Sequence, residues 1–137
     1  MNTAVFSGLS KYRDFGLLVL RLGLGVAFVV YGYPKMFGGP EKWGEIGGAM
    51  GMFKVTFAPV AWGFAAAFAE FVGGILIILG LFFRFAALLM MITMIVATAH
   101  HLNAGDPLTT ALNPLVLACV FFALLFEGPG KLSVDGK

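Results

Sequence analysis

Two ionisable residues lie inside stretches of the chain that are otherwise lipid-soluble. Arg21 interrupts LLVLRLGLGVAFVV, and Glu70 interrupts GFAAAFAEFVGGILIILG. A charge at the centre of a bilayer is costly, so such residues usually face the interior of a helix bundle, where they pair with one another or line a path. The two residues therefore predict a buried polar site within the membrane.

Helical spacing places both charges on faces made of small residues, which are typical where membrane helices approach closely. These faces hold Gly25 and Gly32 around Arg21, and Gly63, Ala66, Ala67, Gly73, Gly74 and Ile77 around Glu70. Counted from the predicted helix ends, Arg21 lies about 9 Å and Glu70 about 16 Å from the side of the termini. An extended arginine spans that difference, so we expect an Arg21–Glu70 ion pair, which limits the desolvation cost of both charges.

A second polar group is predicted near the opposite end of the bundle. His100 and His101 lie about 22 to 25 Å from Arg84 along their helix, and adjacent residues point about 100° apart, so only one of them faces the bundle squarely. His100 shares its line with small and polar residues and is expected to face inward. Lys35 and Tyr31 lie at the same level and would form a cationic and aromatic rim.

Each of these residues also has a structural interpretation. The Arg21–Glu70 pair would equally lock two helices together, and His100 and His101 can extend toward the membrane interface. No further His, Cys or carboxylate stands at ligand spacing, so no metal or haem site is predicted. The chain has one cysteine, Cys119, which excludes an internal disulfide and a C-x-x-C redox pair.

The elements that hold these residues are predicted to be membrane helices. Hydrophobic residues make up 60% of the 137 residues and charged residues 12%, too few charges for a soluble domain of this length. A helix needs about 20 apolar residues to cross a bilayer. The chain is therefore predicted to be a single all-α transmembrane domain over residues 1–137, an antiparallel bundle of four spans. The spans are expected at residues 15–33, 57–81, 85–102 and 107–126.

Proline and acidic residues suggest where these spans begin and end. Pro34 is expected to stop the first span, and Pro59 is tolerated in the first turn of the second. Asp106 is expected to cap the N-terminus of the fourth span, and Pro114 inside it predicts a kink.

The connection between the first two spans is rich in glycine but also contains Trp43 and several other apolar residues. It is predicted to be either a short interfacial helix over the bundle mouth or a loop resting on the surface. With four spans, both termini lie on one side. That side carries five Lys or Arg residues against three on the other, which favours cytoplasmic termini in a multi-pass protein of the cell (inner) membrane. The net charge of +2 does not indicate nucleic-acid binding.

Four motifs in order resemble the DoxX family of small bacterial and archaeal membrane proteins. They are RLGLG from Arg21, YGYPK from Tyr31, EFVGGILIILGLFFR from Glu70 to Arg84, and the tail EGPGKLSVD from Glu127. The resemblance implies a four-helix membrane bundle and a link to redox metabolism, since relatives are similar to the membrane subunit of a thiosulfate:quinone oxidoreductase. Arg21, Lys35, Glu70 and Arg84 match the recurrent polar positions of the family.

Three functions remain open. The first is a quinone-linked oxidoreductase or its quinone-binding subunit, in which buried polar groups bond to the quinone and relay protons. In it, Glu70, Arg21 and His100 would be catalytic, and Lys35, Tyr31 and His101 would bind the cofactor. Because the chain shows no flavin, haem or metal signature, electrons would come from a soluble or membrane redox partner.

The second function is a non-enzymatic accessory subunit that anchors a soluble partner at the bilayer. The third is a small transporter. Four helices form at best a narrow path and no inverted repeat is visible, although homo-oligomerisation through the small-residue faces would widen it.

Overall fold

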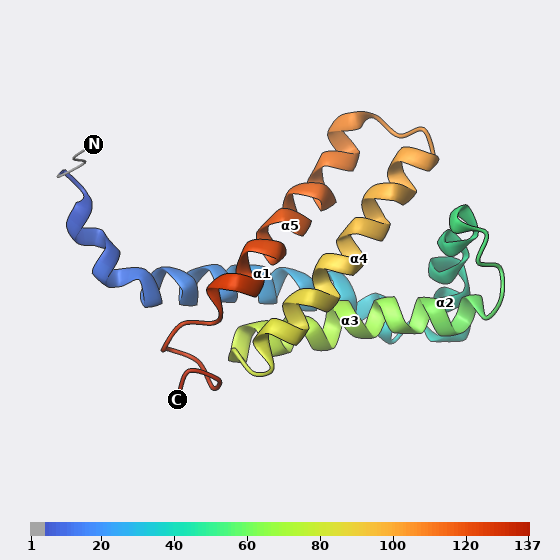
Figure 1. Ribbon diagram of the computed structural model, residues 1–137. Coiled ribbons are helices and arrows are strands. Elements are labelled where there is room, and N and C mark those ends of the chain that lie inside the picture. The colour runs from blue at the N-terminus through green and yellow to red at the C-terminus, as the bar shows by residue number, and fades with distance from the viewer. Residues whose placement is uncertain (1–4) are drawn as a thin grey trace.

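The computed structural model describes residues 5–137, which form helices joined by short connections (Figure 1). The elements are η1 (Ser7–Tyr12), α1 (Arg13–Met36), α2 (Gly39–Gly47), η2 (Gly48–Phe53), α3 (Pro59–Leu79), α4 (Phe83–Asn103) and α5 (Leu108–Glu127). Four of them, α1, α3, α4 and α5, are long and apolar enough to cross a membrane. The prediction of an all-helical protein with four antiparallel spans is confirmed.

Helix α1 does not end at Pro34, so that prediction was wrong. The helix continues to Met36 with Pro34 inside its last turn. Proline lacks a backbone donor and its ring crowds the carbonyl four residues earlier, but the turn that follows is held by Lys35. The Lys35 side chain is bound by Glu70, and its backbone carbonyl accepts a hydrogen bond of 2.9 Å from Trp43 Nε1. These contacts with residues distant in sequence thus keep the last turn of α1 helical, although the local preference of proline is to end the helix there.

The start of α5 also differs from the prediction. Pro107, with an extended backbone, precedes the helix, which begins at Leu108. Asp106 does not cap it, because its carboxylate lies 2.7 Å from Nδ1 of His101 at the end of α4. Pro59 opens α3 and Pro114 lies inside α5, as expected.

The connection between α1 and α3 is a pair of short helices, α2 and η2, so of the two predicted alternatives the structure has the helical one. Helix α2 packs directly on the start of α3. Two glycines make this close approach: a Cβ at Gly47 would overlap the carbonyl of Pro59, and a Cβ at Gly63 would overlap the carbonyl of Trp43. The glycines that look like a flexible linker in the sequence therefore act as packing residues.

The long helices pack as two pairs, α1 with α3 and α4 with α5, and α3 also contacts α4. In Figure 1 the two pairs diverge from the α3–α4 turn. Near that turn they share an apolar core, in which Phe28 of α1 meets Phe121 of α5 edge to face with ring centroids 5.5 Å apart. The α1–α3 contact is made by small residues, since a Cβ at Gly32 would lie 2.7 Å from the backbone nitrogen of Phe71. The predicted small-residue faces are thus confirmed.

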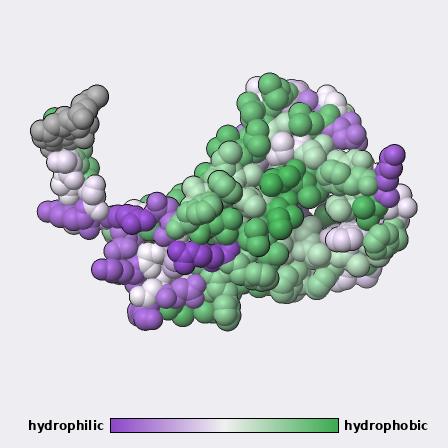
Figure 2. All heavy atoms as spheres, in the orientation of Figure 1, coloured by the Kyte–Doolittle hydropathy of each residue, from purple (hydrophilic) through white to green (hydrophobic). Residues whose placement is uncertain are grey.

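The outer surface of the long helices is apolar, and hydrophilic residues gather near the two chain termini (Figure 2). Leu20, Val30, Phe68 and Ile95, for example, are all exposed. An apolar surface of this extent is what contact with lipid tails requires. The chain is accordingly a multi-pass membrane protein.

Candidate functional site

The carboxylate of Glu70 is buried in the middle of α3 and is paired with Lys35 of α1. The Lys35 ammonium donates hydrogen bonds to both carboxylate oxygens, at 3.1 Å to Oε1 and 2.9 Å to Oε2. The Glu70 side chain is 8% exposed, whereas the Lys35 side chain is 37% exposed. The pair therefore consists of an enclosed anion and a cation that still reaches the surface.

Lys35 reaches Glu70 because α1 continues past Pro34. Arg21, Gly25, Phe28 and Gly32 are the buried residues of α1, and Lys35 follows Gly32 at the same helical spacing. Lys35 therefore lies on the face of α1 that packs against α3. If the line of inward-facing residues in α1 is continued past Pro34, the sequence alone indicates that Lys35 faces α3 and can pair with Glu70.

Helix α2 closes this end of the α1–α3 pair. Trp43 donates its indole hydrogen to the carbonyl of Lys35 at 2.9 Å, and its ring contacts Phe64 of α3 edge to face. One residue thus fixes α2 to both helices that carry the ion pair.

Arg21 does not pair with Glu70, so the predicted Arg21–Glu70 contact was wrong. Arg21 is 1% exposed, and its guanidinium donates four hydrogen bonds, all to backbone carbonyls. The acceptors and their distances are Ile77 (3.1 Å), Ile78 (2.8 Å), Pro129 (3.1 Å) and Leu132 (2.8 Å). Arg21 therefore caps the C-terminus of α3, where unpaired carbonyls favour a cation.

The error arose from the relative positions of the two helices. The prediction placed their ends at the same height, but Gly25 lies against Gly74 and Ile78. Arg21, one turn earlier, is consequently level with the end of α3, and the first turns of α1 extend beyond it. Arg21 binds the carbonyl of Ile77, which is seven residues beyond Glu70, about 10 Å along the helix axis. Glu70 therefore pairs with Lys35 and not with Arg21.

The C-terminal segment, residues 128–137, folds back over the end of α3 and the start of α4. Val134 and Asp135 donate their backbone hydrogens to the carbonyls of Leu79 and Gly80. The Asp135 carboxylate accepts the first backbone hydrogens of α4, from Phe82 at 3.0 Å and Phe83 at 2.8 Å. The segment is thus a double cap, which satisfies helix ends that have no partner within their own helices.

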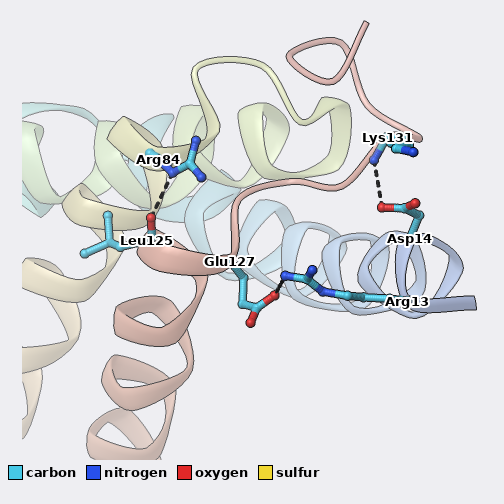
Figure 3. Close-up of polar contacts among 6 residues, drawn as sticks. All are labelled: Arg13, Asp14, Arg84, Leu125, Glu127 and Lys131. Atoms are coloured by element: carbon cyan, nitrogen blue, oxygen red, sulfur yellow. Dashed lines mark hydrogen bonds and ion pairs between the residues drawn. The ribbon is translucent and has the colours of Figure 1, made fainter. Parts of the chain in front are cut away.

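Further contacts tie this segment and its neighbours to α1 (Figure 3). The Asp14 carboxylate accepts the backbone hydrogen of Lys131 at 3.0 Å, and Arg13 forms an ion pair with Glu127. Arg84 of α4 donates from Nε to the carbonyl of Leu125 at 2.9 Å. Polar residues from α1, α4, α5 and the C-terminal segment therefore meet at the termini side.

The histidines lie apart from Glu70. His100 is exposed, so its predicted inward orientation was wrong, and the buried line of α4 instead runs through Met90, Met94 and Thr98. The positions of α5 and α3 decide which face of α4 is buried. The buried face carries larger side chains than the line of small and polar residues that the sequence pattern favoured. His101 is half-buried and lies against Asp106.

Tyr31 is 63% exposed and contacts Phe28 rather than the ion pair. The predicted site residues therefore do not converge: among residues 5–137, Glu70 and Lys35 are the only ones from different helices that are in contact. Within residues 5–137, no three His, Cys, Asp or Glu side chains are grouped so as to hold a metal ion.

Comparison with known proteins agrees with this architecture. The DoxX family model matches residues 16–102, more than half of the chain. The chain belongs to the DoxX family. It is 30% identical over 96% of both chains to an uncharacterized protein of Haemophilus influenzae. It is 29% identical over the full length of both chains to the inner membrane protein YphA of Escherichia coli. No solved structure matches the chain.

The motifs of the DoxX resemblance thus occupy two separate places. Lys35 and Glu70 form the buried ion pair under α2. Arg21, Arg84 and the tail meet at the termini side, where their contacts are made mainly with backbone groups. The first place contains the only buried carboxylate among residues 5–137 and is the stronger candidate for chemistry.

Proposed function

We propose that this DoxX protein is the quinone-binding membrane subunit of an oxidoreductase, with the Lys35–Glu70 pair as the site of the quinone head group. The observation that supports it is the asymmetric exposure of the pair. Intramembrane ionisable residues commonly serve proton relays or bind ligands, and a bound quinone supplies a carrier of two electrons and two protons.

The residues present fit such a head group. Two hydrogens of the Lys35 ammonium are used by Glu70, and the third is free to donate to a carbonyl oxygen, because an ammonium has three donors. Glu70 holds the cation in place and accepts a proton within the bilayer. Arg21 and His100 have no part in this site, since Arg21 directs four of its five N–H groups to backbone carbonyls and His100 is exposed. A redox partner is proposed as the electron donor.

The test is quinone content. The protein is purified from its native membranes in mild detergent, and quinone in the lipid extract is measured per protein for the wild type, Glu70→Gln and the control Glu45→Gln. Glu45 is exposed on α2 near the same end. We expect the wild type and Glu45→Gln to retain quinone and Glu70→Gln to lose it at unchanged yield. Wild-type protein without quinone, together with unchanged quinone reduction by Glu70→Gln membranes, would refute the proposal.

A second candidate is an accessory subunit that anchors a soluble partner. It is favoured by the fixed polar end at the termini side, where Arg21, Asp14 and Asp135 hold the C-terminal segment in place. Under this function, Glu70→Gln would lower the yield of protein and of its complex in parallel, with no separate loss of activity. The excess of Lys and Arg on the same side supports a cytoplasmic location for this end.

A further inference from the structure

The short helix η1 carries a row of apolar side chains that no other helix covers. A 3-10 helix has three residues per turn, so side chains three positions apart lie above one another. Leu9 donates its backbone hydrogen to the carbonyl of Phe6 at 3.0 Å, so Phe6 belongs to the same turn and shares a row with Leu9 and Tyr12. These three residues are 72%, 58% and 56% exposed. Within residues 5–137, η1 contacts no helix except α1.

The two remaining sides of η1 differ from this row. One side carries the hydroxyl residues Ser7 and Ser10, and the other ends in Lys11, whose ammonium lies 5.2 Å from the centre of the Tyr12 ring. The segment is therefore amphipathic, with an apolar row, a hydroxyl side and a cation next to an aromatic ring. Segments of this composition lie in the interface of a membrane, with the apolar side toward the acyl chains.

The position of η1 along α1 fits that interface. Helix α1 has 24 residues and is about 36 Å long, more than the roughly 30 Å of a hydrocarbon core. Arg13 and Asp14 in its first turn carry charges, which the core excludes. Both are held at the termini side, Arg13 by Glu127 and Asp14 by the backbone of Lys131. These contacts place the start of η1 at the level of the lipid head groups.

The chain bends where η1 meets α1. Tyr12 has a φ of −99° and a ψ of 18°, which is not helical, and in Figure 1 η1 turns away from the axis of α1. A straight continuation of α1 would carry Phe6 and Leu9 into water. A bend at the boundary allows the same residues to lie along the surface of the bilayer.

We propose that residues 6–12 are an interfacial anchor that binds the head-group layer of the termini-side leaflet. Phe6 and Leu9 insert among the upper parts of the acyl chains, and the Tyr12 hydroxyl and the Lys11 ammonium reach the phosphates. Lipid is the occupant that the observations favour, because Phe15 of α1, three residues after Tyr12 and equally exposed, continues the row into the lipid-facing surface of the span. The anchor is separate from Lys35 and Glu70 and does not depend on the proposed function.

The experiment compares the two sides of η1 in the full-length protein, reconstituted into vesicles of phosphatidylcholine and phosphatidylglycerol. In a Cys119→Ala background, Leu9→Cys and Phe6→Cys each place a thiol on the apolar row, and Ser10→Cys places the matched control on the hydroxyl side. Each thiol is labelled with an environment-sensitive fluorophore. Quenching is measured with a lipid nitroxide located just below the head groups and, separately, with aqueous iodide.

We expect the lipid nitroxide to quench the labels at Leu9→Cys and Phe6→Cys several-fold more strongly than the label at Ser10→Cys, and iodide to show the reverse order. Equal iodide quenching at all three positions would show that the segment lies in water and would overturn the proposal. Labels on the apolar row that are shielded from iodide but not quenched by the lipid nitroxide would also overturn it, because a second copy or another protein would then cover the row. Since η1 contacts no other helix than α1 among residues 5–137, these variants leave the packing of the bundle unchanged, and each of the two apolar positions tests the proposal independently.

Discussion

Replacing Arg21 with methionine tests whether this buried cation holds the end of the fold. Methionine keeps the apolar length of the side chain but removes four hydrogen bonds to carbonyls. The carbonyl of Ile77 keeps a second donor, Gly80, and those of Pro129 and Leu132 regain water if the C-terminal segment detaches. The partly buried carbonyl of Ile78 has no other donor among residues 5–137, and leaving it unpaired costs about 1–3 kcal/mol.

Loss of the cation at the C-terminus of α3 adds about 0.3–2 kcal/mol. The variant also avoids the cost of removing the guanidinium from water. The net loss of stability is therefore well below the sum of four charged hydrogen bonds. We therefore expect Arg21→Met to lower the free energy of unfolding by about 2–4 kcal/mol. The measurement is unfolding of the purified protein in mixed micelles by increasing denaturing detergent.

The matched control is Arg13→Met, since Arg13 forms an exposed ion pair with Glu127 at the same end. Exposed pairs contribute about 0–1 kcal/mol, so this variant should unfold almost as the wild type does. A second measurement is the rate of trypsin cleavage after Lys131, which should rise in Arg21→Met as the C-terminal segment detaches. If Arg21→Met is as stable as Arg13→Met and Lys131 stays protected, the assigned role of Arg21 is wrong.

Three further predictions concern other contacts. Lys35→Met should destabilise the protein by about 3–5 kcal/mol, because it leaves the buried Glu70 carboxylate unpaired. Glu70→Gln should cost only about 1–2 kcal/mol, because the Lys35 ammonium can turn to solvent. Unfolding of the two variants in mixed micelles compares these costs. Gly63→Ala should cost about 1–3 kcal/mol in the same assay, because it forces α2 away from α3. The control is Gly23→Ala, which should be neutral or stabilising by about 0.5–1 kcal/mol because Gly23 has open space around it. Asp135→Ala should cost about 1 kcal/mol and accelerate hydrogen exchange of the two capped backbone amides at the start of α4, and unchanged exchange there would count against the cap.

The four spans could be predicted from the sequence because lipid imposes a strong requirement on length and apolarity. The small-residue faces around Arg21 and Glu70 were equally predictable, since close helix packing selects Gly and Ala. Both signals are local to one helix. They say which face is buried but not how far one helix is shifted along the other.

The errors at the site come from that missing information. Because α1 extends beyond the end of α3, Arg21 meets carbonyls at the helix end and Glu70 meets Lys35. The continuation of α1 through Pro34 depends on Glu70 and Trp43, which are distant in sequence. Contacts of this kind override the local preference of a proline. They cannot be recognised from a short stretch of sequence, because such a stretch never includes both partners.

The contacts also separate what the fold needs from what a function would need. Arg21 and Asp135 bind helix ends, so folding alone explains the presence of these two residues. Lys35 and Glu70 bind only each other through their charges, and a buried ion pair is often no more stabilising than apolar residues of similar volume. The double variant Lys35→Met with Glu70→Leu should therefore unfold within about 1 kcal/mol of the wild type, although Lys35→Met alone does not. A double variant that folds normally but retains no quinone would show that the charges serve binding, and one that retains quinone at the wild-type level would remove the pair from the site.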